Sequence, residues 1–267
     1  MLKSIAFIGA GNMAEALITG LLQAKLVDAD RITAIDLREE RLNELSAQYG
    51  LKTSPSLDRL STNDVVVLSV KPQSFEGLLE ALSGKINRES VIISIAAGIT
   101  LSTIEAKLPQ NKVIRAMPNT PALVGMGATA IAQGKLADDR DMESAKAIFS
   151  SVGLCLSVNE KDMDAVTALS GSGPAYAFRF IELLAEHGKD LGLAEDIANA
   201  LAVQTVLGAA TLVDETKQPP QALRQKVSSP GGTTVAGLAA LEQAGFSKAI
   251  ESCLNAAHAR SKELSKG

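Results

Sequence analysis

The sequence has 267 residues, of which 46% are hydrophobic and 21% are charged, and its formal net charge is −4. A chain of this length buries a substantial core and forms about two domains. The slight negative charge offers no broad cationic surface, which argues against nucleic acid or a membrane as a partner.

The chain contains few of the side chains that most often act in catalysis. It has two His, two Cys and no Trp. A zinc site takes about three or four protein ligands, and the His and Cys residues are too few and too scattered to supply them. We therefore expect no metal site and a chemistry that does not depend on a titrating side chain. There is no disulfide framework, no signal peptide and no apolar run as long as a membrane span, so we expect a cytoplasmic protein.

Short apolar runs alternate with amphipathic stretches over residues 1–160. The stretches predict helices at 12–24, 39–48 and 75–82. The runs predict strands at Ile5–Ile8, Ile32–Ile35, Val65–Leu68, Val91–Ile93 and Val113–Ile114. Because these runs are continuously apolar, they indicate a doubly wound α/β domain whose parallel sheet is covered on both faces.

The remaining residues, 161–267, show no strand signal. Their pattern predicts helices at 173–188, 195–216 and 236–264, so this part is expected to be all-α. Ser172 is the expected N-cap of the first of these helices, with Pro174 in its first turn.

A glycine-rich segment follows the first predicted strand and has the form G-x-G-x-x-A. Gly9 permits a tight turn, Gly11 lets the backbone approach a pyrophosphate, and Ala14 lets the next helix pack closely on the strand. The N-terminus of helix 12–24 then faces the phosphates. This context favours a Rossmann dinucleotide site over a purely structural turn, with candidate cofactor contacts at Ile8, Gly9, Ala10, Gly11, Asn12 and Met13.

The second predicted strand ends at Asp36. An acidic residue there accepts hydrogen bonds from the adenosine ribose of NAD, although Asp36 could instead cap the following helix. Arg38 and Arg41 come next, and either could bind the 2′-phosphate of NADP. The cofactor is therefore NADPH or NADH, with Asp36 favouring NADH.

Small or Pro-rich segments follow the next three strands, at Ser69-Val70-Lys71-Pro72, Ala96-Ala97-Gly98 and Met117–Pro121. The carboxyl ends of strands in such sheets line the ligand crevice, so these segments are expected to border a ribose or nicotinamide. Within the last of them, Asn119 presents an amide suited to a carboxamide or a substrate. Lys71 is more simply a strand-ending residue than a Schiff-base lysine.

In the helical part, Val227–Thr234 places successive hydroxyls and glycine N–H groups before a helix expected at 236–244. This composition is typical of a carboxylate-binding nest. An elaborate helix cap is the alternative.

At this point the chain resembles a known family. The segments GAGNMAEAL, SVKPQ, AAG, RAMPNTPA, ALSGSGPAYAF and VSSPGGTT occur in the order and approximate spacing of pyrroline-5-carboxylate reductases, over residues 4–262. These enzymes use a nicotinamide cofactor to reduce Δ1-pyrroline-5-carboxylate to L-proline, the last step of proline biosynthesis. The resemblance implies a Rossmann NAD(P)-binding domain at 1–160 and a helical dimerisation and substrate-binding domain at 161–267.

The resemblance also implies roles for individual residues. It places the pyrophosphate on Gly9, Gly11, Asn12 and Met13, and the ribose and nicotinamide beside Val70, Lys71, Pro72, Ala96 and Ala97. It places the substrate on Ser229, Gly231, Gly232, Thr233 and Thr234, with the catalytic Thr234 hydroxyl near the ring nitrogen. It further implies a homodimer with interlocked helical domains, a higher assembly such as a decamer, and active sites that include both chains.

Three other functions fit parts of the pattern. A β-hydroxyacid dehydrogenase shares the two-domain plan but needs a lysine early in the second domain, and 175–179 contains none. A reductase of six-membered imines differs by a single methylene, worth about 1–3 kcal/mol of binding. A dinucleotide sensor would keep Gly9, Gly11 and Asp36 but has no use for a carboxylate nest.

Overall fold

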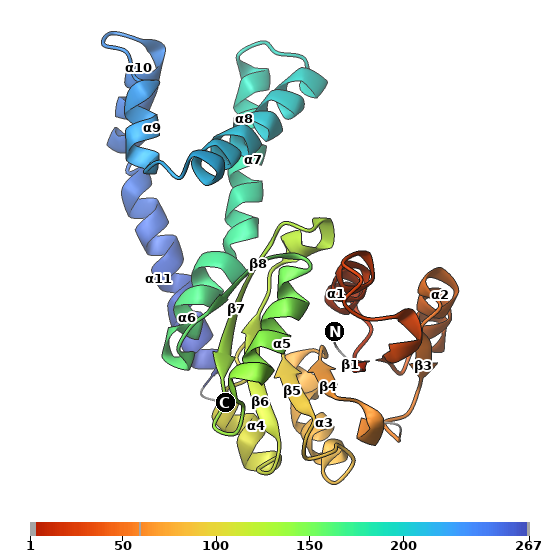
Figure 1. The fold of residues 1–267 in the computed structure, drawn as a ribbon. Helices are drawn as coiled ribbons and strands as arrows, with labels where there is room; N and C mark the ends of the chain where they lie inside the picture. The colour runs from red at the N-terminus through yellow and green to blue at the C-terminus, as the bar shows by residue number, and fades with distance from the viewer. Residues whose placement is uncertain (1–3, 59, 266–267) are drawn as a thin grey trace. The chain divides into compact units, whose positions relative to one another are not determined.

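The computed structural model describes residues 4–58 and 60–265. The chain forms two compact units, Met1–Ser172 with Ala257–Gly267 and Gly173–Ala256, which we call the sheet unit and the helical unit. The chain enters the helical unit after Ser172 and returns to the sheet unit within its last helix (Figure 1).

The sheet unit is built on an eight-stranded sheet in the order β3-β2-β1-β4-β5-β6-β7-β8. Every neighbouring pair is parallel except β6 and β7. The strands are β1 (Ile5–Ile8), β2 (Ile32–Ile35), β3 (Lys52–Ser54), β4 (Val65–Leu68), β5 (Val91–Ser94), β6 (Lys112–Met117), β7 (Gly127–Gln133) and β8 (Gly153–Ser157). The direction of winding reverses between β1 and β4, which is the switch point where doubly wound sheets bind ligands.

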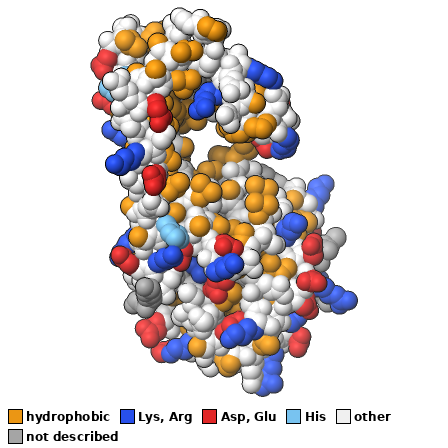
Figure 2. Space-filling view, turned by 90° about the vertical axis from the view of Figure 1, so that its left-hand side faces the viewer, with side chains coloured by type: hydrophobic (Ala, Val, Ile, Leu, Met, Phe, Trp, Pro, Cys, Tyr) orange, Lys and Arg blue, Asp and Glu red, His pale blue; other side chains and the backbone are white. Residues whose placement is uncertain are grey.

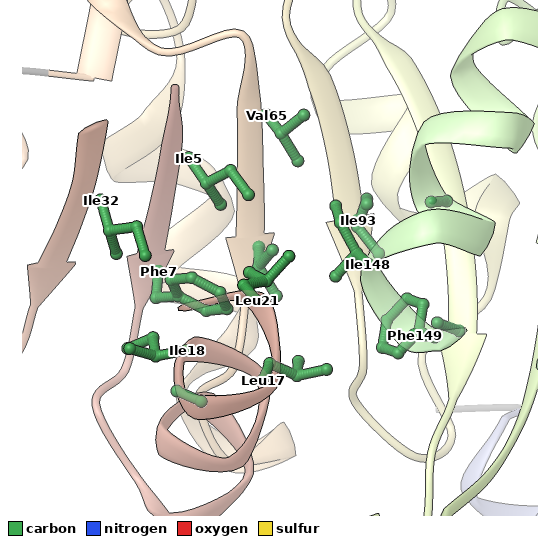
Figure 3. Close-up of a cluster of buried hydrophobic side chains, with 14 of the residues drawn as sticks. Ile5, Phe7, Leu17, Ile18, Leu21, Ile32, Val65, Ile93, Ile148 and Phe149 are labelled. Atoms are coloured by element: carbon green, nitrogen blue, oxygen red, sulfur yellow. The ribbon is translucent and has the colours of Figure 1, made fainter. Parts of the chain in front are cut away.

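Both faces of this sheet are covered. In β1, Ile5 and Phe7 belong to one apolar cluster, and Ala6 and Ile8 belong to the cluster on the opposite face. Figure 3 shows the first cluster, in which residues of α1 lie beside Phe7 and residues of α5 lie near Ile93. The covering helices are α1 (Asn12–Gln23), α2 (Glu39–Tyr49) and α5 (Asp139–Ser150) on the first face, and α3 (Phe75–Leu82) and α4 (Leu101–Lys107) on the second.

The expected α/β fold is confirmed, but three strands were not anticipated from the sequence. β3 is a short polar strand at one edge of the sheet, and β7 is rich in small residues, so neither contains a run of large apolar side chains. β8 forms the other edge, and its central Cys155 is buried while its two neighbours on the strand are exposed. The sheet is also not wholly parallel, because β7 returns antiparallel to β6.

A continuous helical path leads out of the sheet unit. It runs from α6 (Met163–Val166) through a π-helical turn at Thr167–Gly171 into α7 (Gly173–Asp190). Ser172 has helical dihedral angles, φ −86° and ψ −20°, and its N–H donates to the carbonyl of Thr167 (2.8 Å). The expectation that Ser172 is an N-cap is therefore wrong, because an N-cap has an extended backbone.

The helical unit contains α7, α8 (Glu195–Thr216), α9 (Pro220–Lys226), α10 (Thr233–Gln243) and the first part of α11 (Phe246–Leu264). The helical stretch expected over 236–264 is divided at Gly245, with φ +82°, into α10 and α11. α10 also begins three residues earlier than expected, so Thr233 and Thr234 lie in its first turn rather than before it. The short α9 was not anticipated.

The surface of the helical unit is unusually apolar for a single chain, as the exposed hydrophobic side chains in Figure 2 show. On α8, Leu201, Leu207 and Leu212 are 54%, 48% and 50% exposed. By length and composition alone α8 could cross a membrane, so the expectation that no apolar run reaches that length was wrong. An exposed apolar surface of this kind is typical of a protein interface.

The last turns of α11 pack on the sheet unit. Ser261 Oγ donates to Oδ1 of Asp164 (2.7 Å). A methyl group on Gly98 would lie 2.9 Å from Leu264 Cβ, so the helix approaches the end of β5 too closely for any larger residue there. Two separate segments, the π-helical turn and the end of α11, thus belong to the sheet unit and flank the helical unit in sequence.

β6 carries a buried charge that is paired across the sheet unit. The Arg115 side chain is 4% exposed, and its Nη1 lies 3.4 Å from Oε1 of Glu160. The same carboxylate oxygen accepts the N–H of Leu101 at the start of α4 (2.6 Å). Glu160 therefore joins β6 to the first turn of α4.

We expect Glu160→Ala to destabilise the protein by about 3 kcal/mol, because it leaves the Arg115 guanidinium buried without a counter-charge. Glu80→Ala, which removes the exposed partner of Lys107, is the matched control and should cost less than about 1 kcal/mol. Urea unfolding of the two variants measures both values. Equal losses of unfolding free energy in the two variants would show that burial of Arg115 does not make its ion pair with Glu160 more important than an exposed one.

Candidate active site

The glycine-rich turn joins β1 to α1 at the switch point of the sheet. Gly9 has φ +91°, and its N–H donates to the carbonyl of Ile35 (2.7 Å). A Cβ atom at this position would lie 2.6 Å from the carbonyl oxygen of Ser69, at the end of β4. Only glycine therefore satisfies both the dihedral angle and the contact.

The N-terminus of α1 is open to a ligand. Its N-cap is Gly11, which has no side chain to occupy the free N–H groups of the first turn. A methyl group on Gly11 would meet nothing within 4 Å, whereas Ala14 one turn later is fully buried. Unpaired N–H groups and the helix dipole make this helix end suited to an anion such as the pyrophosphate of a dinucleotide.

The ends of β1, β4 and β5 lie side by side, as the sequence predicts. The N–H of Ser69 donates to the carbonyl of Ile8 (2.8 Å), and the N–H of Ile95 donates to the carbonyl of Leu68 (3.2 Å). Val70, Lys71, Pro72, Ala96 and Ala97 follow directly on these ends. Lys71 is exposed, so it lacks the desolvation that a Schiff-base lysine needs.

Asp36 is held by the protein itself. Its Oδ2 accepts the N–H of Ala10 (2.8 Å) and Nη2 of Arg38 (3.0 Å), and its Oδ1 accepts the N–H and Nε of Arg38 (both 3.0 Å). Hydrogen bonds from Arg38 lower the pKa of Asp36 to about 2. The carboxylate thus joins the glycine turn to the start of the segment after β2.

The two arginines that the sequence left equivalent have different environments. The Arg41 side chain is 18% exposed. Its Nε donates to the carbonyl of Ala10 (2.8 Å), and its other nitrogens pair with Glu15 and Glu44. The Arg38 side chain is 63% exposed. Arg41 therefore supports the glycine turn, and Arg38 is the arginine that an incoming ligand can reach.

A cavity of about 470 Å³ opens beside these groups. It is bordered by Gly9, Asp36, Arg38 and Val70, which the sequence identified. It is also bordered by residues that sequence reasoning missed, Leu37, Pro55, Leu57, Ser74 and Leu78. Leu37 follows β2, Pro55 and Leu57 lie in the loop after β3, and Ser74 and Leu78 lie just before and within α3. No sequence motif marks these positions. Apolar walls beside a glycine turn suit a flat aromatic base.

Asn119 lies 8% exposed after β6. Its Oδ1 accepts the N–H of Ala128 (2.8 Å), and its Nδ2 donates to the carbonyl of Ser170 in the π-helical turn (3.0 Å). Its amide therefore connects the end of β6 to β7 and to the π-helical turn, and one N–H remains for a ligand.

The segment Ser229–Thr234 lies in the helical unit. Gly231 has φ +72°, and Gly232 is the N-cap of α10 in an extended conformation. Like Gly11, Gly232 provides no side chain to cap the helix, so the N–H groups of the first turn are available to a carboxylate. Thr233 and Thr234 are exposed in that turn. The helix-cap alternative is weakened, because Ser228 Oγ instead donates to the carbonyl of Arg224 (2.7 Å).

The histidines lie apart from these groups along the chain. His187 pairs with Asp190 through Nδ1 (3.0 Å), and both side chains are about 70% exposed. His258 is half-buried on α11.

Two family models match the chain. The model described as pyrroline-5-carboxylate reductase dimerisation matches residues 160–264, and the one described as NADP oxidoreductase, coenzyme F420-dependent, matches residues 4–98. A pyrroline-5-carboxylate reductase of a Synechocystis strain is 45% identical over 98% of both chains. One from Methanosarcina acetivorans is 43% identical over 99% of this chain and 98% of that relative.

Solved structures agree with these matches. A pyrroline-5-carboxylate reductase from Coxiella burnetii superposes with a TM-score of 0.94 at 38% identity, over 100% of both chains. The Plasmodium falciparum enzyme, solved with NADP bound, superposes with a TM-score of 0.89 at 30% identity, over 99% of this chain and 100% of that one. With its switch-point glycine turn and its uncapped α10, the chain belongs to the pyrroline-5-carboxylate reductase family.

Proposed function

We propose which residues perform each step of the reaction that this chain catalyses, the NAD(P)H-dependent reduction of Δ1-pyrroline-5-carboxylate to L-proline, the last step of proline biosynthesis. Residues 1–160 bind the cofactor, and residues 161–267 bind the substrate and form the dimer. When bound, the reduced nicotinamide supplies the hydride. The chain therefore has to bind, orient and shield the reactants.

The sheet unit binds the dinucleotide mainly through its backbone. The turn Ile8–Met13 accepts the pyrophosphate at the N-terminus of α1, which is supported by the glycine N-cap and the space beside Gly11. The ribose and nicotinamide lie along the strand ends at Ser69–Pro72 and Ala96–Ala97. Asn119 uses its remaining N–H toward the ligand. The contact between Gly9 and the Ser69 carbonyl supports this arrangement, because it brings the turn and a strand end together.

The first turn of α10 binds the substrate. Its free N–H groups and the Gly231–Gly232 backbone accept the carboxylate, with Ser229 and Thr233 beside it. The Thr234 hydroxyl is the catalytic group and orients the ring nitrogen. A protonated imine is already electrophilic, so no strong general acid is needed. The uncapped N-terminus of α10 is the observation that carries this assignment.

The chain functions as a homodimer whose helical units interlock, with active sites completed by both chains and with dimers assembling further, for example into a decamer. The matched dimerisation model covers residues 160–264, and α8 exposes leucines along its length. Burying these side chains against a second copy removes apolar surface from water. We also propose that the protein is cytoplasmic, because both of its cysteines are free thiols.

We expect Thr234→Ala to lower kcat about 10- to 100-fold, the scale of one lost hydrogen bond to a charged group. Thr234→Ser keeps the hydroxyl and should retain most of the activity. Steady-state rates of NADPH and NADH oxidation with the imine as substrate measure both. Unchanged kcat/KM in Thr234→Ala would refute the role.

Replacing His187 or His258 by Ala should leave kcat unchanged, because neither side chain takes part in the chemical step. The same assay tests this, with sedimentation confirming that assembly is intact. Abolished turnover in a folded, assembled variant would show that the mechanism needs a titrating side chain.

Leu207→Glu should shift the protein from dimer or larger assemblies toward monomer, because it places a charge within the apolar face of α8. Gln110→Glu adds the same charge at an exposed polar position of the sheet unit and is the control. Analytical ultracentrifugation distinguishes the species. An unchanged assembly in Leu207→Glu would exclude this face of α8 from the interface.

A further inference from the structure

The Asp36 carboxylate has no acceptor position left for a ribose. A carboxylate offers about four lone-pair sites. Here Oδ2 accepts from Ala10 N and Arg38 Nη2, and Oδ1 accepts from Arg38 N and Nε, at 2.8–3.0 Å. The Asp36 side chain is 11% exposed. A ribose 2′-hydroxyl could bind this carboxylate only by displacing Arg38.

The pairing with Asp36 also orients Arg38. A guanidinium has five N–H donors in a planar fork, and Nε and one N–H of Nη2 are directed at Asp36. Three N–H donors remain on a side chain that is 63% exposed and that borders the same cavity as Gly9 and Val70. A fork held in this way is suited to a phosphate, which guanidinium groups bind through two parallel hydrogen bonds.

The neighbouring Arg41 does not offer the same geometry. Arg41 is engaged with Ala10, Glu15 and Glu44 and is largely buried. Its positive charge is thus neutralised by two carboxylates. The charge of Asp36 is likewise neutralised by Arg38, so a phosphate arriving at Arg38 does not face an unpaired carboxylate.

We propose that Asp36 is a positioning residue that holds Arg38, and that Arg38 selects a 2′-phosphorylated adenosine, so that this chain prefers NADPH over NADH. This reverses the preference that an acidic residue at the end of β2 predicts. The proposal rests on the proposed function in one respect, the binding of the dinucleotide at the glycine turn.

Replacing Asp36 separates the two readings of this residue. If Asp36 is a ribose acceptor that repels phosphate, then Asp36→Asn weakens binding of the ligand without a 2′-phosphate and strengthens binding of the ligand that carries one. If Asp36 positions Arg38, the same change weakens binding of the ligand with a 2′-phosphate, because the guanidinium loses the partner that directs it.

Isothermal titration calorimetry of the full-length protein with two probes, adenosine 2′,5′-bisphosphate and adenosine 5′-monophosphate, tests the proposal. Arg38→Ala should weaken binding of the bisphosphate about 10- to 100-fold, the scale of losing charge-assisted hydrogen bonds, and should change binding of the monophosphate little. Asp36→Asn should also weaken binding of the bisphosphate. Arg38→Lys should weaken this binding by a smaller factor, since a lysine keeps the positive charge but lacks the planar set of N–H donors. Arg31→Ala, at the opposite end of β2, is the control and should change neither.

Stronger bisphosphate binding by Asp36→Asn, or unchanged bisphosphate binding by Arg38→Ala, would overturn the proposal. If Asp36→Asn fails to fold, the Arg38 variants still decide it, because Arg38 is mainly exposed. Probe binding needs no imine. Failure of catalysis with the expected pattern of probe binding would therefore contradict the proposed function and leave this inference standing.

Discussion

The structure depends on a single close approach of backbone to backbone, the contact between Gly9 and the carbonyl of Ser69. A side chain at Gly9 would lie 2.6 Å from that oxygen and would push β1 away from the end of β4. The contact places the glycine turn at the point where the winding of the sheet reverses. The open N-terminus of α1, the anchoring of Asp36 to Ala10 and the adjoining strand ends all follow from it.

Two helices with glycine N-caps explain how a chain with few titrating side chains can be a reductase. α1 starts after Gly11 and α10 starts after Gly232, and in both cases the cap residue is extended and has no side chain. Such helices are less stable than helices capped by Ser, Thr, Asp or Asn, although a glycine N-cap costs only about a few tenths of a kcal/mol. In return they keep N–H groups free for anions, and we propose a pyrophosphate at α1 and a carboxylate at α10. Both reactants carry the charges that backbone dipoles can bind.

The sequence was sufficient where structure depends on local patterns. The bounds of β1, β2 and β4 agree with their continuous apolar runs, because both faces of the sheet are buried. The bounds of α3 and α8 agree with the helices expected at 75–82 and 195–216. β7 was missed because its Gly and Ala residues leave no run of large apolar side chains, and β8 was missed because its short apolar run, Leu154–Leu156, contains no β-branched residue. The state of Asp36 could not be inferred, since it depends on the distant N–H of Ala10 and on the rotamer of Arg38. Local signals identify a site, whereas partners across the fold decide its selectivity.

The pairing of Asp36 with Arg38 explains why the preference for NADPH or NADH cannot be predicted from the acidic residue at the end of β2 alone. An acidic residue at the end of β2 disfavours a phosphate only if its charge is unpaired, and a bidentate arginine at hydrogen-bond distance cancels most of that repulsion. The low pKa of Asp36 means that the carboxylate stays ionised, and so stays paired, throughout the neutral range. The identity of the residue at position 36 therefore matters less than the orientation it gives to Arg38. Asp36 and Arg38 therefore act as one group that presents the guanidinium of Arg38 to the ligand. The preference for a 2′-phosphate follows from this exposed guanidinium.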